Sequence, residues 1–310
     1  INFFKPGIFI FKSSQNRAIK DGENFKNKKY IIYTSDEEGL INISEDEVLF
    51  RIPKKIFEIT DRFISWGKEQ TDILNKNYEN ISDKIITAGN SRFDILRNPI
   101  NQIFNTEAEN IKKKYGEFDL YISAFHKYNA ISYPGTDWFT GSKFYSEKRK
   151  QLFFNMFKAQ EKNMNATINF FNNNVDKTSR KIIFRPHPSE NISTWIEKLH
   201  PKLKQNVIYD DLNTNSWILA AKRIYSYYST SLIEGIILGK KSINLIFFDK
   251  NVYDTKIFDI CDKIVNPKDF KDLESKINNS ENSLEDLRKK LEKYTEFQNL
   301  FSSEIICDDI

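Results

Sequence analysis

The feature that most restricts the fold is a regular alternation of short apolar runs with longer segments of helical spacing. The runs are rich in β-branched and aromatic residues, and turn-forming residues bound them. Such alternation is typical of parallel strands joined by crossover helices. We expect strands at 7–11, 30–34, 62–65, 84–87 and 119–123 in one series, and at 181–184, 206–209, 223–227 and 242–246 in a second.

A long helix-compatible stretch, from Ser146 to about Asn173, separates the two series and predicts a domain boundary near residue 150. We therefore predict an α/β protein with two Rossmann-like, doubly wound parallel sheets that face one another across a cleft. The predicted parts are a first domain (1–150), a second domain (151–282), and a closing helix and tail (283–310). We expect the first domain to be truncated at its start, because 7–11 already has the pattern of an interior strand.

Composition excludes several classes of protein. Of the 310 residues 47 are basic and 43 acidic, so the net charge is +4. This balance predicts no nucleic-acid partner, since such proteins cluster their basic residues. No apolar run approaches the roughly 18 residues of a membrane span. The two cysteines, Cys261 and Cys307, form no CxxC pair, which favours free thiols in a cytoplasmic protein and no metal. Basic and aromatic residues around 144–157 permit peripheral contact with the inner face of the membrane, although a solvated helix explains them equally well.

The first chemical motif is a proline-flanked histidine after the expected strand 181–184. Proline fixes φ and donates no amide hydrogen, so Pro186 and Pro188 end the strand and stiffen the loop. Arg185 and His187 would then stand at the carboxyl end of a strand, where both can donate hydrogen bonds to a phosphate. The alternative is a stiff turn with a packed histidine.

The second motif is a hydroxyl-rich helix start after the expected strand 223–227. One of its hydroxyl residues would cap the helix, whose free amides form an anion site. Glu234 would accept hydrogen bonds from ribose hydroxyls, or else form a capping box with Ser231. A glycine inside a helix suggests close approach of a ligand or another backbone. The candidate donor-binding residues here are Ser229, Thr230, Ser231, Glu234 and Gly235.

The third motif is an acidic turn, Asp36, Glu37 and Glu38, followed by Gly39. It follows the strand 30–34 and would lie at the carboxyl edge of the first sheet. A transfer reaction needs a general base, and any of the three carboxylates would serve. A solvated acidic turn is the alternative.

Two further strand-to-glycine turns are candidates for contacts in the cleft, and each is also explained by ordinary turn chemistry. They contain Gly67, Gly89, Asn90 and Arg92. The loop 123–129, which contains His126, is a weaker candidate for acceptor contacts.

Taken in order, these motifs resemble the bacterial surface-carbohydrate biosynthesis proteins, which build capsule and lipopolysaccharide. These are GT-B type glycosyltransferases related to the His-Pro-motif sialyl-, polysialyl- and Kdo-transferases, and there is also similarity to the CDP-glycerol glycerophosphotransferases. The motifs that carry the resemblance are Arg-Pro-His-Pro at 185–188, Ser-Thr-Ser with Glu-Gly at 229–235, Asp-Glu-Glu-Gly at 36–39 and Gly-Asn-Ser-Arg-Phe-Asp at 89–94.

The resemblance implies a second domain that binds a CMP-sugar, with His187, Ser229 and Ser231 at the phosphate and Glu234 at the ribose. It implies a first domain that binds a polysaccharide or lipid-linked glycan acceptor, with the base among the three acidic residues. The implied reaction is inverting and needs neither metal nor cofactor, since a CMP leaving group has one phosphate that a few donors can neutralise.

Three other functions stay open at this point. A CDP-glycerol transferase would use the same motifs on a different donor. A nucleotide-sugar 2-epimerase would share the two-domain architecture and would need no acceptor. A non-catalytic scaffold of a polysaccharide assembly complex would bind no nucleotide.

Overall fold

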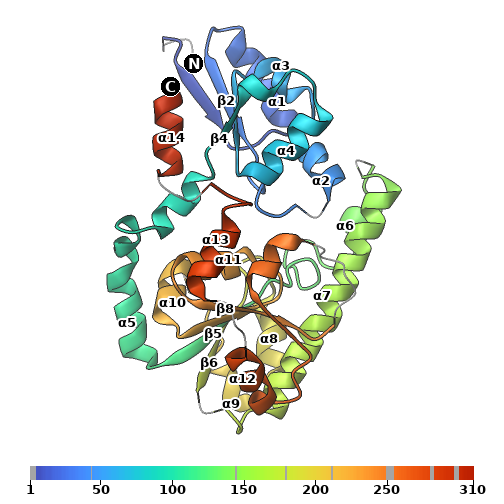
Figure 1. The fold of residues 1–310 in the computed structure, drawn as a ribbon. Coiled ribbons are helices and arrows are strands. Elements are labelled where there is room, and N and C mark those ends of the chain that lie inside the picture. Colours follow the sequence, from blue (N-terminus) through green and yellow to red (C-terminus); the bar gives the residue numbers. More distant parts are fainter. Residues whose placement is uncertain are drawn as a thin grey trace. The chain divides into compact units, whose positions relative to one another are not determined.

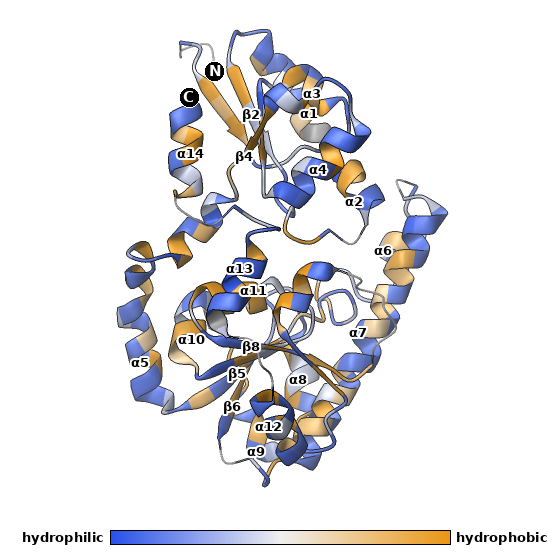
Figure 2. Cartoon of the chain, in the orientation of Figure 1, coloured by the Kyte–Doolittle hydropathy of each residue, from blue (hydrophilic) through white to orange (hydrophobic). Residues whose placement is uncertain are grey.

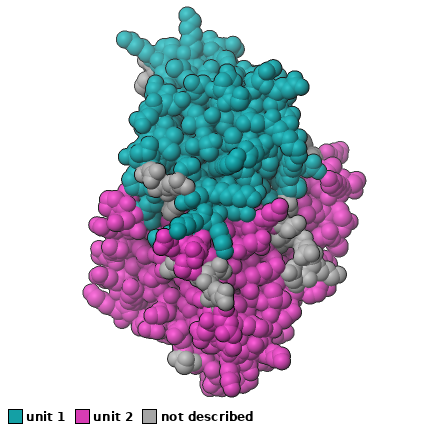
Figure 3. Space-filling model, viewed as in Figure 1, with its two compact units in different colours: residues 1–97, 288–310 teal, residues 98–287 magenta. Residues whose placement is uncertain are grey.

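The computed structural model describes residues 5–42, 44–143, 145–178, 180–210, 212–248, 255–279, 283–296 and 300–310. The chain divides into two compact units (Figure 3), and each unit is built on one parallel sheet. The first unit comprises residues 1–97 and 288–310, and the second comprises residues 98–287. The α/β prediction of two parallel sheets is confirmed.

The four strands of the first sheet lie side by side in chain order, with every pair parallel. The elements of this unit are β1 (Ile8–Phe11), α1 (Asn16–Lys26), β2 (Ile31–Ser35), α2 (Glu45–Arg51), α3 (Ile56–Ile59), β3 (Arg62–Ser65), α4 (Lys68–Asn77), β4 (Ile85–Thr87) and α14 (Ser302–Asp309), and 3-10 turns occupy 82–84 and 91–96.

The two faces of this sheet are covered from opposite ends of the chain. The crossover helices α1 to α4 pack on one face around Phe63 and Leu74. Tyr33 and Ile64 point to the other face, where α14 supplies Ile305 and Ile306 (Figure 1). The C-terminal helix therefore completes the core of the first unit.

The second sheet has the order β6-β5-β7-β8-β9, all parallel. The segment 206–208 adds a further short edge, because Phe184 exchanges two backbone hydrogen bonds with Asn206 and Ile208. The elements are α5 (Asn105–Tyr115), β5 (Phe118–Ile122), α6 (Asp137–Thr140), α7 (Glu147–Asn173), β6 (Lys181–Arg185), α8 (Ile192–Lys198), α9 (Pro201–Lys204), α10 (Thr214–Ala220), β7 (Arg223–Ser226), α11 (Thr230–Ile237), β8 (Lys241–Ile246), β9 (Asp262–Val265), α12 (Phe270–Asn278) and α13 (Leu284–Leu291), and 3-10 turns occupy 100–104 and 256–260.

Helices cover both faces of this sheet, as a doubly wound fold requires. Side chains of α7, α8 and α12 pack on one face, together with the fully buried Tyr121 and Trp195. The side chains of Leu120 and Ile224 point to the other face of the sheet. On that face α5 packs on α10, and α11 packs on β8. Figure 2 shows the hydrophobic strands enclosed between helices of mixed character. Each buried large side chain stabilises such a core by roughly 1.5–3 kcal/mol.

Capping side chains fix where the main helices begin. Ser146 accepts a hydrogen bond from the amide of Arg149 and starts α7, and Asp269 accepts one from the amide of Asp272 and starts α12. These bonds satisfy amides that the first helical turn leaves free. Among the described residues, no helix combines the length and apolarity needed to cross a bilayer.

The division of the chain differs from the prediction of a boundary at residue 150. Strand β5 was assigned to the first domain, but it pairs with β6 and β7 in the second sheet. The boundary lies instead between residues 97 and 98, and the tail 288–310 belongs to the first unit. The predicted end of the second domain at residue 282 lies outside the described residues. The tail contains two helices, α13 and α14, where we predicted one.

Candidate functional site

The candidate site lies at the carboxyl edge of the second sheet, where the strand order reverses. Chain order runs outward from β5 to β6 on one side and from β7 to β9 on the other. Loops that leave adjacent strands at such a reversal diverge, and the crevice between them is where ligands bind in open α/β sheets. The three loops concerned are 123–130, 186–190 and 227–229.

A buried carboxylate joins the first two loops. Glu190 is fully buried, and its oxygens accept hydrogen bonds from Ser123 Oγ at 2.7 Å, the Phe125 amide at 2.6 Å and Trp195 Nε1 at 3.0 Å. Burial raises the pKa of Glu190, and these donors oppose the shift because they favour the charged form. Glu190 therefore fixes the loop after β5 to the loop after β6.

Aromatic packing brings in the third loop. The Tyr227 ring stacks on Phe125 with centroids 5.5 Å apart. Tyr228 has a φ of +46°, a conformation that is unusual for a residue with a side chain. Its amide donates to Asn244 Oδ1 at 3.0 Å, and its ring packs edge-on against Phe258. The loop after β7 is thus held in one defined conformation.

The hydrogen bonds of His187 define which of its nitrogens is available. The amide of Ser189 donates to His187 Nδ1 at 3.2 Å, and the Ser189 hydroxyl lies 2.7 Å from the same atom. Because Nδ1 accepts, the proton of the neutral ring resides on Nε2. Loss of hydration lowers the pKa of His187, although the residue is exposed at the surface. His187 therefore presents an Nε2–H donor at neutral pH.

A second imidazole lies beside the first. The His126 ring, on the loop after β5, has its centroid 4.9 Å from that of His187. Burial lowers the pKa of His126 to about 3, with smaller effects from Lys127 and His187. Its Nδ1 is buried and, within the described part of the chain, makes no hydrogen bond. Two neutral imidazoles thus meet at the reversal point.

The hydroxyl-rich segment begins helix α11 as predicted, with Ser229 as the capping residue. Ser229 Oγ accepts a hydrogen bond from the amide of Ser231 at 3.2 Å, and Thr230 is the first helical residue. The proposed capping box between Ser231 and Glu234 is therefore absent, because the cap is two residues earlier. The helix begins at the same sheet edge as the histidine loop.

The other two predicted residues of this helix face inward. Glu234 is 7% exposed. A side chain at Gly235 would collide with Ser242 Oγ of β8, so this glycine permits close packing of helix on sheet. At Gly235, the backbone of α11 therefore lies close to strand β8.

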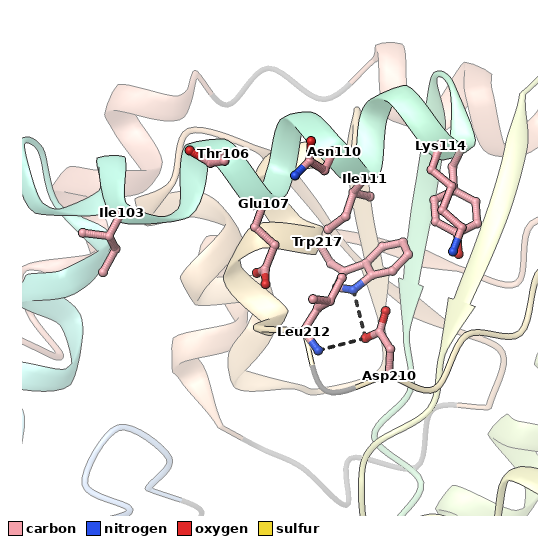
Figure 4. Close-up of a pocket in the computed structure, with 10 residues that line it drawn as sticks. Ile103, Thr106, Glu107, Asn110, Ile111, Lys114, Asp210, Leu212 and Trp217 are labelled. Atoms are coloured by element: carbon pink, nitrogen blue, oxygen red, sulfur yellow. Dashed lines mark hydrogen bonds between the residues drawn. The ribbon is translucent and has the colours of Figure 1, made fainter.

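Arg185 is held by a loop on the opposite side of its strand end. Its guanidinium donates to Asp210 Oδ1 at 2.6 Å and to the Leu212 carbonyl at 2.6 Å. Asp210 also accepts from Trp217 Nε1 and the Leu212 amide, and it lines a cavity of ≈ 410 Å³ beside α5 (Figure 4). Through these contacts Arg185 anchors Asp210 and Leu212. Pro188, in the histidine loop, is exposed.

The three acidic residues of the first unit have distinct environments. Asp36 is 4% exposed, and its carboxylate accepts from Arg51 Nε at 3.0 Å and Gln70 Nε2 at 3.1 Å. Its carbonyl accepts from Trp66 Nε1. Glu37 forms an exposed ion pair with Lys12 at 2.8 Å. Asp36 and Glu37 are therefore both committed to protein partners.

Glu38 has an environment unlike that of its two neighbours. The protein around it displaces water and raises its pKa; Arg51 and Arg92 oppose the shift and Asp36 adds to it. Its side chain nevertheless stays accessible to solvent. Within the described part of the chain, no hydrogen bond or ion pair engages its carboxylate. A raised pKa and a free oxygen are what a general base requires.

Packing within the first unit accounts for the glycines of the three strand-end turns. A side chain at Gly39 would collide with the Trp66 ring, and one at Gly67 would meet the backbone of Tyr294. Gly89 has a φ of +82°, and a side chain there would meet the carbonyl of Glu296. The C-terminal tail supplies two of these three contacts.

The Gly-Asn-Ser-Arg-Phe-Asp turn likewise receives the tail. Asn90 caps the following 3-10 turn by accepting from the amide of Arg92 at 2.9 Å, and Arg92 is exposed. Asp94 is buried and accepts hydrogen bonds from the amides of Ser302 and Ser303 at 2.9 Å. Asp94 thus satisfies the free amides at the start of α14.

Comparison with known proteins supports the fold. No protein-family model matches the sequence, and no curated protein matches it. By structure, the chain is similar to the UDP-GlcNAc 2-epimerase of Methanocaldococcus jannaschii, with a TM-score of 0.57 and 16% identity over 90% of this chain and 72% of that chain. It is also similar to another UDP-N-acetylglucosamine 2-epimerase, with a TM-score of 0.50 and 12% identity over 93% and 68% of the two chains.

A likeness to the wall teichoic acid polymerase TagF covers 98% of this chain and 87% of that chain at 12% identity, but its TM-score of 0.47 is too low to support a conclusion. The epimerase likenesses, with the two parallel sheets, confirm the predicted GT-B-like fold of two Rossmann-like units.

Proposed function

We propose that this protein is a GT-B type glycosyltransferase that moves a sugar from a nucleotide-activated donor to a cell-surface polysaccharide or lipid-linked glycan. We further propose a CMP-linked donor that carries a nonulosonic acid or Kdo-like sugar. The enzyme would act in the cytoplasm, with peripheral contact at the inner face of the membrane.

The observation that carries this proposal is the meeting of His187 and His126 at the reversal of the second sheet, at the edge where α11 begins. The Nε2–H of His187 is a hydrogen-bond donor of the kind that binds a phosphate, and the positive N-terminal end of the α11 dipole favours an anion. Such preorganised donors stabilise charge that develops on a leaving group, and a single phosphate needs few of them. Neutralisation by these donors would make the reaction independent of a metal and of any other cofactor.

In the proposed reaction an acceptor hydroxyl attacks the anomeric carbon of the sugar. The new carbon–oxygen bond forms as the bond to the phosphate oxygen breaks, and the electron pair leaves with CMP. The hydroxyl proton passes to a carboxylate, for which we propose Glu38. Attack opposite to the leaving group inverts the configuration of the carbon.

The epimerase alternative is favoured by one specific observation, the likeness to UDP-GlcNAc 2-epimerases at a TM-score of 0.57. An epimerase would convert a UDP-sugar without any acceptor. A CDP-glycerol transferase would place the same donors on a diphosphate. A scaffold would bind none of these nucleotides.

A thermal-shift panel of CMP, CDP, UDP and GDP tests the proposal, because a ligand that binds only the folded protein raises its apparent stability. We expect CMP to raise the melting temperature, and His187→Ala to remove the effect. The matched control is His200→Ala, since His200 caps the short helix α9 away from the three loops. A response to UDP alone, with turnover of a UDP-sugar in the absence of acceptor, would replace the transferase with the epimerase; no response to any nucleotide would favour the scaffold.

A further inference from the structure

A loop with projecting apolar side chains follows the His126 segment. Ile131 is 57% exposed and Tyr133 is 64% exposed, although side chains of this kind are usually covered in a core. The backbone of the loop is fixed where it leaves the site, because the Ile131 amide donates to the Ser189 carbonyl at 2.9 Å. The two apolar groups are therefore held outward by an anchored loop.

An aromatic cluster surrounds Phe153, in the first turns of α7. The Phe153 ring contacts Trp138, Phe139 and Tyr145, with centroids 5.4, 5.9 and 5.2 Å away. Phe154 is 40% exposed beside it. Phe144, also noted in the sequence, lies outside the described residues. Tryptophan and tyrosine have an apolar body and a polar end, which suits the boundary between lipid and water.

This end of α7 is not part of the core of the second unit. The buried residues of the helix begin at Met156, and none lies in 147–155. The first turns of α7 therefore extend past the sheet, and together with α6 and the loop 130–136 they form a separate surface.

The same stretch carries most of the net charge of the protein. Five basic residues lie between positions 127 and 150, against the two carboxylates Asp137 and Glu147. The stretch therefore contributes +3, while the whole chain has +4. The basic residues are Lys127, Lys143, Lys148, Arg149 and Lys150.

We infer that this α6–α7 surface, defined by Ile131, Tyr133, Trp138, Lys143, Lys148 and Phe154, docks the protein on an anionic lipid membrane. Anionic headgroups attract clustered lysines, and the interfacial layer accepts aromatic and aliphatic side chains. An anionic soluble glycan would satisfy the lysines, but it offers no apolar phase for Ile131 and Phe154. The membrane is therefore the partner that matches both features.

The α6–α7 surface lies close in the chain to the histidine loops. Ala130 forms an isolated backbone bridge with Glu190, the residue that joins the two histidine loops. A membrane bound at 131–154 therefore lies within one loop of the phosphate site. This inference rests on the proposed function only for its purpose, the delivery of a lipid-linked acceptor; the docking itself needs no catalysis.

Co-sedimentation with lipid vesicles tests the inference, with phosphatidylcholine vesicles compared against vesicles that also contain phosphatidylglycerol. We expect the protein to bind only the anionic vesicles. Lys143→Glu with Lys148→Glu should weaken binding by about tenfold or more, because each basic residue near an anionic surface strengthens binding by about fivefold. Ile131→Ser with Tyr133→Ser should also weaken it, whereas Tyr133→Trp should retain it.

The matched control is Lys112→Glu with Lys113→Glu, which makes the same change of charge on the exposed face of α5. This control should bind like the unchanged protein. The inference is overturned if the anionic vesicles do not bind, if the α5 control weakens binding equally, or if the serine variant binds normally. It is also overturned if the lysine pair governs binding to heparin but not to vesicles.

Each variant is checked by its melting temperature and by its response to CMP. If a variant loses vesicle binding but keeps a normal melting temperature and a normal response to CMP, the loss comes from the changed surface and not from misfolding. If the unchanged protein binds vesicles but shows no response to any nucleotide, the proposed function fails while the docking surface stands. If it responds to CMP but not to vesicles, only the docking surface fails.

Discussion

Replacing Asp36 with asparagine should destabilise the first unit rather than remove a catalytic base. The carboxylate is buried and ion-paired to the equally buried Arg51, and it also accepts from Gln70 Nε2 and the Glu38 amide at 3.1 and 3.2 Å. Asparagine keeps the shape but removes the charge. The guanidinium of Arg51 would then stay buried without its ion-pair partner, and the exposed carboxylate of Glu38 would be a more distant countercharge.

The size of the effect follows from the burial of both partners. Removing one member of a buried ion pair costs about 3–5 kcal/mol, because the other charge is left without compensation. For a unit of this size, each 1 kcal/mol lowers the melting temperature by roughly 3–4 °C, so Asp36→Asn should lower it by roughly 10–20 °C.

Thermal unfolding followed by circular dichroism measures this change, and hydrogen exchange assigns it to the first unit. The control is Glu37→Gln, which breaks only the exposed pair with Lys12 and should melt like the unchanged protein. If Asp36→Asn melts normally and loses only turnover, then the carboxylate acts in the chemistry and the structural role argued here is wrong.

Three further predictions concern the site. His187→Ala should lower transfer from a radiolabelled donor by roughly 10²–10³-fold, the usual loss for one preorganised donor, without a change in melting temperature; near-normal turnover would remove His187 from the mechanism. Glu38→Gln should lower turnover while CMP still raises the melting temperature, and normal turnover would place the base elsewhere. His126→Asn should flatten the pH dependence of stability. The pKa of His126 is lowered to about 3 in the folded protein and is about 6.5 in the unfolded chain, so between these values the unfolded state binds more protons. In the unchanged protein, the free energy of unfolding should therefore fall by about 1.4 kcal/mol per pH unit below about pH 6.5, and His126→Asn should lack this contribution. Urea titrations give the free energy of unfolding at about pH 5 and about pH 7, and an equal change between these pH values in both proteins would contradict the prediction.

Most individual elements could be predicted because their signals are local. The strands expected at 62–65 and 181–184 lie within a residue of β3 and β6, and the helix expected from Ser146 is α7, Glu147–Asn173. Each depends on the residue pattern within its own window. The strand expected at 206–209 is shorter than predicted, since this segment pairs only with Phe184. Strand β9 was missed, because Asp262 and Lys263 interrupt its apolar pattern.

The membership of a strand in a sheet is not a local property, which explains the misplaced boundary. Nothing within 118–122 indicates whether its partners precede or follow it in the chain. The strand becomes an interior strand of the second sheet because the later strands β6 and β7 pair with its two edges. For the same reason, the sequence does not indicate that α14 packs on the sheet of the first unit.

Within the site, sequence motifs predicted positions better than roles. The loops of His187 and Ser229 do lie at one sheet edge, as their place after parallel strands requires. Glu190 was missed, because its role depends on a loop 65 residues away reaching it. The only signal in the sequence was an acidic residue directly after Ser189, at the end of a proline-stiffened turn. A side chain at Gly39 or Gly67 would collide with Trp66 or with the backbone of Tyr294, so protein packing accounts for a glycine at each position.

The acidic turn shows how environment separates residues that the sequence leaves equivalent. Asp36, Glu37 and Glu38 are consecutive, so spacing and chemistry gave each the same claim to be the base. A base must hold an oxygen that no protein cation already occupies, and Asp36 and Glu37 do not meet this condition. It must also have a proton affinity above that of a fully hydrated carboxylate, and the raised pKa of Glu38 meets this one. The buried pair of Asp36 and Arg51 holds the turn in place, and Glu38, two residues after Asp36, keeps an exposed carboxylate, which is why we propose it as the base.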